Sequence, residues 1–106
     1  MSFDINNVTE RIVELGEEWA DNNAAAEILE ETKSTLLAEL KTFSAEKSDA
    51  ARETEAKANP RYKKHLEHMV EARRLANRSK VNYEAAKTWT DLLRTKEANL
   101  RAEMKL

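Results

Sequence analysis

Five basic residues recur at intervals of seven in the second half of the chain, and their spacing is suited to contact with a partner. They are Arg73, Lys80, Lys87, Arg94 and Arg101. On a helix, a spacing of seven places each side chain almost above the last, so the five cations form a stripe along one side. Such a stripe can contact successive phosphates of a nucleic acid, or it can pair with carboxylates on a neighbouring helix.

Further cations crowd the beginning of the same segment, with tyrosines among them. The group comprises Lys57, Arg61, Lys63, Lys64, Arg73, Arg74, Arg78 and Lys80, with Tyr62 and Tyr83 interleaved. Tyrosine rings can stack on bases. The candidate contacts for a nucleic acid or a protein partner are therefore Arg73, Arg74, Arg78, Lys80, Lys87, Arg94 and Arg101. Two observations oppose direct nucleic-acid binding: the pI is about 5.8, and no known DNA-binding motif is present.

Metal binding and catalysis have little support in the residue types. His65 and His68 lie one helical turn apart, but neither an HExxH motif nor the Glu-x-x-His pairs of di-iron bundles occur. The chain has no cysteine, and Gly16 is its only glycine, so it lacks thiolate ligands, a glycine-rich phosphate loop and a nucleophile elbow. We expect exposed histidines, no metal, no cofactor and no enzymatic activity.

The elements that position these residues are predicted to be two arms of opposite charge. Residues 1–56 carry fourteen acidic and five basic residues, a net charge of −9, whereas residues 57–106 carry six acidic and thirteen basic residues, a net charge of +7. The sign changes at Ala58-Asn59-Pro60, which holds the only proline. Asn before Pro is a good helix start, with Asn as the N-cap.

We therefore predict a single helical domain with an acidic arm over about 7–57, a turn at 58–60 and a basic arm over about 60–104. Asp21-Asn22-Asn23 could divide the first arm into a short N-terminal helix and a longer one. Both arms carry seam positions that step by three and four residues, as in a coiled coil. The first series is Ile12, Leu15, Trp19, Asn22, Ala26, Leu29, Lys33, Leu36, Leu40, Phe43, Lys47, Ala50 and Thr54. The second series is Tyr62, Leu66, Met69, Ala72, Ala76, Ser79, Tyr83, Ala86, Thr90, Leu93, Glu97, Leu100 and Met104.

The expected fold class is all-α, an elongated antiparallel hairpin with arms of about 70 Å. A reversal at Asn59-Pro60 would bring three acidic residues level with three basic ones. The matched pairs would be Glu46 with Arg73, Glu39 with Lys80, and Glu18 with Arg101. In these registers the acidic residues occupy position g and the basic ones position e, which do not face each other in an antiparallel pair. The stripe is thus either internal, with one register shifted, or free for another chain.

Three apolar residues of the second arm, Val81, Trp89 and Leu92, fall outside its seam. Two helices bury only one seam, so we expect these residues to anchor a partner or a second copy, and we expect a homo-oligomer. Trp19, by contrast, lies on the seam of the first arm.

The second arm resembles small helical proteins encoded by temperate phages and prophages. The resemblance covers roughly residues 60–106. It rests on the stretches Tyr62–Leu66, Val70–Arg73, Ala76–Tyr83 and Lys87–Trp89, with Leu92 and Arg94-Thr95. It implies an accessory role in DNA recombination or replication and transfers no site residues.

The function expected is therefore that of a non-enzymatic interaction protein, a phage accessory factor acting through protein–protein contacts. The alternatives are direct nucleic-acid binding by the basic arm and a structural or assembly role. The N-terminal residues Met1–Asp4 lack a basic or apolar signal region, and no apolar run is long enough to span a bilayer. We expect no membrane partner and a cytoplasmic location, which for a phage protein is the host cytoplasm.

Overall fold

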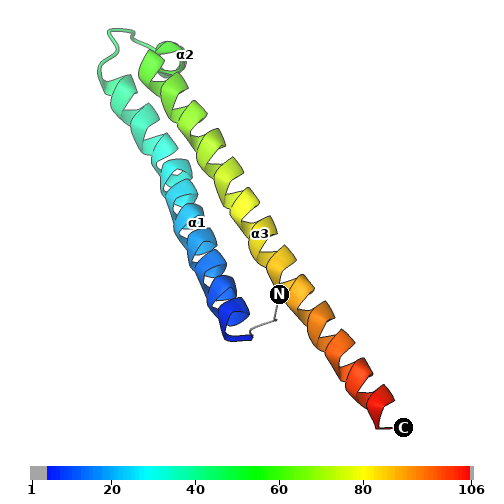
Figure 1. Cartoon of the computed structure of the whole chain (residues 1–106). Helices are drawn as coiled ribbons and strands as arrows, with labels where there is room; N and C mark the ends of the chain where they lie inside the picture. Colours follow the sequence, from blue (N-terminus) through cyan, green and yellow to red (C-terminus); the bar gives the residue numbers. More distant parts are fainter. Residues whose placement is uncertain (1–4, 106) are drawn as a thin grey trace.

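The computed structural model describes residues 5–105, and their fold is an elongated helical hairpin (Figure 1). The helices are α1 (Ile5–Thr42), α2 (Asp49–Ala58) and α3 (Pro60–Met104). The two long helices lie antiparallel and side by side, and α2 lies at the end where the chain reverses (Figure 1). The molecule measures 83 × 19 × 17 Å. The predicted all-α elongated hairpin is confirmed.

The place of the reversal differs from the prediction. We predicted that the acidic arm would run to residue 57, but α1 ends at Thr42 and residues 43–48 form a loop before α2. The end of α1 tightens through two hydrogen bonds, from the Phe43 amide to the Leu40 carbonyl and from the Ser44 amide to the Lys41 carbonyl. Phe43, which we placed on the seam, is 75% exposed. The predicted positions Lys47, Ala50 and Thr54 lie outside α1.

The short helix α2 has an N-cap of its own, which favours the start of a new helix over the continuation of α1. The Ser48 hydroxyl accepts a hydrogen bond from the Ala51 amide at 3.1 Å, and Asp49 provides a carboxylate in the first turn. Lys41 forms an ion pair with Asp49 at 2.7 Å, which ties the end of α1 to the start of α2. The reversal therefore spans the whole of 43–59 and is not a tight turn.

The predicted start of the basic arm is confirmed. The Asn59 side-chain oxygen accepts a hydrogen bond from the Arg61 amide at 2.8 Å, and Pro60 is the first residue of α3. Proline disfavours helical geometry in the residue before it, so α2 ends here. The predicted turn at 58–60 is thus a break between α2 and α3.

The predicted break at Asp21-Asn22-Asn23 does not occur, because α1 is continuous from Ile5 to Thr42. The two asparagines make contacts across the helix pair instead of capping a new helix. The Asn22 amide nitrogen donates to the Ser79 hydroxyl at 2.6 Å, and the Asn23 side-chain oxygen accepts from Arg73 at 2.9 Å.

The seam between α1 and α3 follows both predicted series as far as Leu40 and Leu93. Its buried members are Leu15, Ala26 and Leu40 on α1 and Tyr62, Ala76, Ser79 and Thr90 on α3. Several of them are small, so the helices approach closely. At the reversal, Leu40, Ala56 and Tyr62 form a small core against which Leu36, Leu37 and Leu66 pack, and this core fixes α2 against both long helices.

The C-terminal part of α3 extends beyond the N-terminal end of α1 at Ile5 (Figure 1). Gly16 lies against Tyr83, and antiparallel helices advance at the same rate, so Ile5 lies level with about Arg94. Residues 95–104 have no part of α1 beside them and extend for about 15 Å at 1.5 Å per residue. We call this segment the overhang.

Candidate interaction surfaces

The first two cations of the basic stripe contact α1, and the third contacts an aromatic ring of its own helix. Arg73 makes two hydrogen bonds to the Glu30 carboxylate, at 2.7 and 3.1 Å, and its side chain is only 34% exposed. The Lys80 Nζ lies 5.8 Å from the centre of the Trp19 ring, and the Lys87 Nζ lies 5.0 Å from the centre of the Tyr83 ring. Each distance is within the range of cation–π attraction. This part of the stripe flanks the seam.

The predicted partners of the stripe were wrong. Arg73 pairs with Glu30, sixteen residues before the predicted Glu46, and Glu39 lies near Arg61 at 3.5 Å and not beside Lys80. The reason is the early end of α1, which shifts every level match by the length of the loop and α2. Arg101 pairs with Glu97 of its own helix at 3.7 Å, and not with Glu18.

The remaining candidate cations are held loosely. Arg74 lies 3.9 Å from Glu71 of its own helix, with both side chains mostly exposed. Arg78 and Arg94 are exposed and make no ion pair within residues 5–105. Of the seven predicted contact residues, Arg73 and Lys80 therefore contact α1, Lys87 contacts Tyr83 of its own helix, and the other four project into solvent.

The Arg73–Glu30 pair has a clear electrostatic signature. The hydrogen bond from Arg73 lowers the pKa of the Glu30 carboxyl below its ordinary value of 4.5; loss of hydration opposes this effect, and the positive charge of Arg73 adds to it. The same hydrogen bond raises the pKa of the Arg73 guanidinium. The pair is thus favoured in its charged form over the whole neutral range.

The outer face of α3, which we define as Val81, Trp89 and Leu92, lies off the seam. Val81 and Trp89 are both 63% exposed, and Leu92 is 59% exposed. Val81 and Leu92 are eleven residues apart, which is close to three full turns, so they lie on one side of the helix. Large apolar side chains exposed on the same helix provide a surface on which a partner can bury area.

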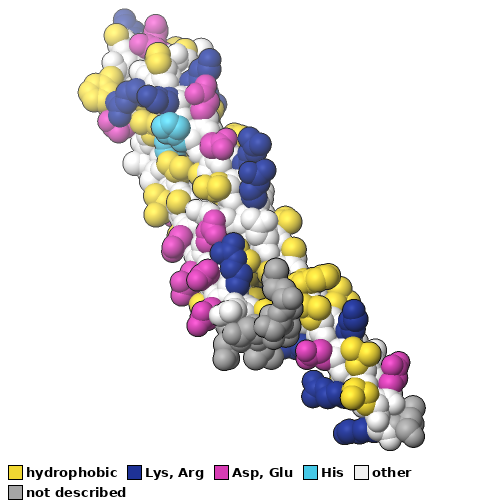
Figure 2. Space-filling view, in the orientation of Figure 1, with side chains coloured by type: hydrophobic (Ala, Val, Ile, Leu, Met, Phe, Trp, Pro, Cys, Tyr) yellow, Lys and Arg dark blue, Asp and Glu magenta, His cyan; other side chains and the backbone are white. Residues whose placement is uncertain are grey.

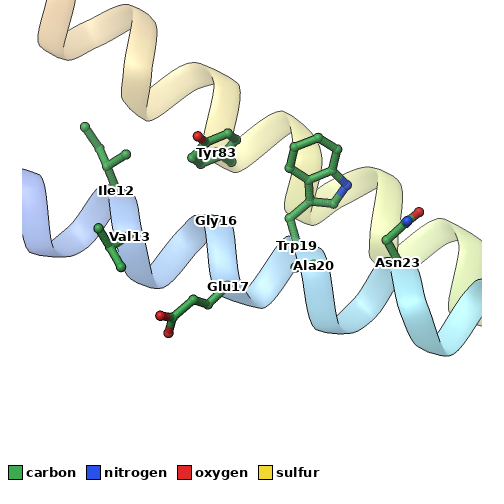
Figure 3. Close-up of a pocket in the computed structure, with 8 residues that line it drawn as sticks. All are labelled: Ile12, Val13, Gly16, Glu17, Trp19, Ala20, Asn23 and Tyr83. Atoms are coloured by element: carbon green, nitrogen blue, oxygen red, sulfur yellow. The ribbon is translucent and has the colours of Figure 1, made fainter.

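A second surface, which the sequence did not reveal, is an open groove of about 590 Å³ along the N-terminal half of α1 (Figure 3). We call it the Gly16 groove; its lining residues are Ile12, Val13, Gly16, Glu17, Trp19, Ala20, Asn23 and Tyr83. Figure 3 shows Ile12 and Trp19 pointing toward α3, with Tyr83 above the bare backbone of Gly16. The Tyr83 and Trp19 ring centres are 5.6 Å apart.

Gly16 permits this arrangement because it has no side chain. A Cβ atom at this position would lie 3.1 Å from the Tyr83 Cε2, which is tighter than ordinary van der Waals contact. The single glycine of the chain was the available signal, but its role depends on which residue of α3 faces it, and that in turn depends on the register.

The histidines do not form a metal site in the described part of the chain. The His65 Nε2 lies 2.7 Å from the Leu29 carbonyl oxygen, to which it donates, so His65 links α3 to the backbone of α1. His68 is exposed. Across residues 5–105 there is no group of three or more potential metal ligands, and no helix is both long and apolar enough to span a bilayer.

The opposite charges of the two long helices persist in the folded chain. Helix α1 carries nine acidic and three basic residues, and α3 carries six acidic and eleven basic residues. Figure 2 shows acidic side chains gathered along the lower part of α1, while basic and hydrophobic side chains, with some acidic ones among them, continue to the end of α3. The free end of α3 therefore combines apolar side chains with charged side chains of both signs, Lys96 and Arg101 beside Glu97 and Glu103.

Comparison with protein-family models, with curated proteins and with solved structures gives no match. The resemblance of residues 60–106 to phage-encoded helical proteins stays a prediction from the sequence.

Proposed function

We propose that this protein is a non-enzymatic helical interaction protein that binds another protein through the outer face of α3. The observation that supports this is the exposure of Val81, Trp89 and Leu92 on a helix whose opposite side already packs on α1. Tryptophan is the residue type most often found at the energetic centre of protein interfaces. An exposed indole on a rigid helix also loses little conformational freedom on binding.

Within this proposal, the biological role is that of a phage-encoded accessory factor, and the partner is a protein of DNA recombination or replication. The support for this role is the resemblance of the second arm to small phage proteins. The location proposed is the cytoplasm of the host cell.

The test compares capture of proteins from a bacterial lysate by the wild-type chain and by two variants. Trp89→Ala removes the central anchor of the outer face. Phe43→Ala is the matched control, because Phe43 is also an exposed aromatic residue but lies at the other end of the molecule, in the loop after α1. We expect wild type and Phe43→Ala to retain a DNA-processing protein, and Trp89→Ala to lose it. Equal capture by all three proteins would refute a role for the outer face.

Direct nucleic-acid binding by α3 is the alternative function. The observation that favours it is that four of the candidate cations, Arg74, Arg78, Arg94 and Arg101, are exposed and project into solvent. The observation against it is that Arg73, Lys80 and Lys87 contact side chains within the hairpin, beside an acidic helix whose field repels a polyanion. A structural or assembly role is the third proposal, supported by the rod-like shape.

A further inference from the structure

The overhang is one half of a seam that has no second half beside it among residues 5–105. Leu93, Leu100 and Met104 continue the seam spacing of α3. Leu100 and Met104 are exposed because they lie past the N-terminal end of α1, at Ile5. Arg94 and Arg101 continue the basic stripe whose earlier members contact α1. The overhang, with Leu93 and Arg94 directly before it, therefore continues the seam positions and the basic stripe that, closer to the reversal, pack on an acidic helix; it also carries Glu97 and Glu103.

The Gly16 groove has the complementary properties. Its floor is apolar, and Val13 is more than half exposed along it. Glu17 lines the groove, and Glu10 lies seven residues before it on the same side of α1. Arg94 and Arg101 are also seven residues apart, so two copies of the chain present matched pairs of opposite charge at equal spacing.

We infer that two copies form a two-fold symmetric dimer in which the overhang of each copy lies in the Gly16 groove of the other. In such a pair the two α3 helices run antiparallel, so each overhang runs parallel to the α1 that it contacts. Arg94 then lies beside Glu10 of the second copy, and Arg101 beside Glu17. With this register Leu100 is level with Gly16, and Met104 is level with Ala20.

The arrangement uses contacts that the hairpin already makes. The overhang meets an acidic helix with an apolar face, as the rest of α3 does within one chain. A two-fold arrangement uses the same two patches on both copies, so the assembly closes at two. The inference shares with the proposed function only the premise that the free surface of α3 binds protein.

A charge exchange tests the pairing. Arg94→Glu with Arg101→Glu should weaken the dimer about tenfold or more, since two attractive pairs, each present twice in the symmetric dimer, become repulsive. Glu10→Lys with Glu17→Lys should weaken it by a similar factor. All four changes together should restore dimerisation. Lys63→Glu with Lys64→Glu makes the same change in charge at the far end of α3 and is the matched control.

Sedimentation equilibrium at micromolar concentration gives the masses, and circular dichroism confirms that every variant stays helical. A 12.2 kDa monomer at all concentrations would overturn the inference. A dimer whose dissociation constant does not change with the charge substitutions would overturn the inference as well. Either result would leave the capture of a lysate protein through Trp89 unaffected, so the dimer and the proposed function can be refuted independently.

Cross-linking tests the register, because the chain has no cysteine of its own. A mixture of Ala20→Cys and Met104→Cys copies, treated with a short bis-maleimide, should give a covalent heterodimer. Neither variant alone should cross-link, because equivalent residues lie far apart in the two-fold arrangement. Efficient linking of Met104→Cys to itself would show that two overhangs pair with each other and would refute the groove.

Discussion

Removal of the Ser79 hydroxyl provides a sharp test of the α1–α3 register. Ser79 is 4% exposed and accepts a hydrogen bond from the Asn22 amide at 2.6 Å in the middle of the seam. Ser79→Ala leaves a half-buried amide without its partner, which costs roughly 1–3 kcal/mol. Because Asn22 retains some access to water, we expect a loss of about 1 kcal/mol, or a fall in melting temperature of roughly 4–8 °C.

Removal of the other partner of this hydrogen bond, in Asn22→Ala, should lower the free energy of unfolding by less. In Asn22→Ala the Ser79 hydroxyl can rotate and donate to the carbonyl four residues before it, as Thr90 does to Ala86 in the same helix. A double-mutant cycle in chemical denaturation, followed by helical circular dichroism, should give a coupling energy of about 0.5–1.5 kcal/mol between the two residues. Equal losses for the two single variants together with no coupling would refute the contact and the register that depends on it.

Two further predictions concern the charged residues. Because Arg73 lowers the pKa of Glu30, the folded state favours the carboxylate; the stability from this pair is present above the ordinary pKa of 4.5 and is lost as pH falls through the lowered value. The melting temperature should therefore be steady near neutral pH and fall in acid, with a shallower fall in Glu30→Gln. Replacement of Arg73, Lys80 and Lys87 by Gln should lower the melting temperature, with about 0.5 kcal/mol lost for each cation–π contact, and wild type should not bind DNA at about 50 mM salt. Binding that weakens with a slope of about 0.7–0.9 per phosphate contact in log K against log salt would contradict this prediction.

The sequence predicted the seam well because burial depends on a periodic pattern that both helices carry over many turns. It also predicted the start of α3, since Asn59-Pro60 combines a side-chain cap with a residue that ends the preceding helix. The exposure of Trp89 followed from its place off the seam.

The early end of α1 was missed because no glycine or proline marks it. The available signal was Ser48-Asp49, an N-cap followed by an acidic first residue, in a segment otherwise compatible with helix. One missed loop then moved every interhelical pair. Local helix formation could thus be predicted, whereas the pairing of Arg73 with Glu30 required the length of the connection.

The rod shape affects how the protein behaves in solution. A compact chain of about one hundred residues has a radius of gyration of about 13 Å, whereas the value here is 23.5 Å. Friction with the solvent rises with such elongation, so a single copy should diffuse slowly and elute from a sizing column ahead of globular proteins of its mass. The elution volume of a monomer could then be mistaken for that of an assembly. Light scattering and small-angle X-ray scattering separate mass from length, and a greater particle length at doubled mass is expected when two rods overlap along only part of their length.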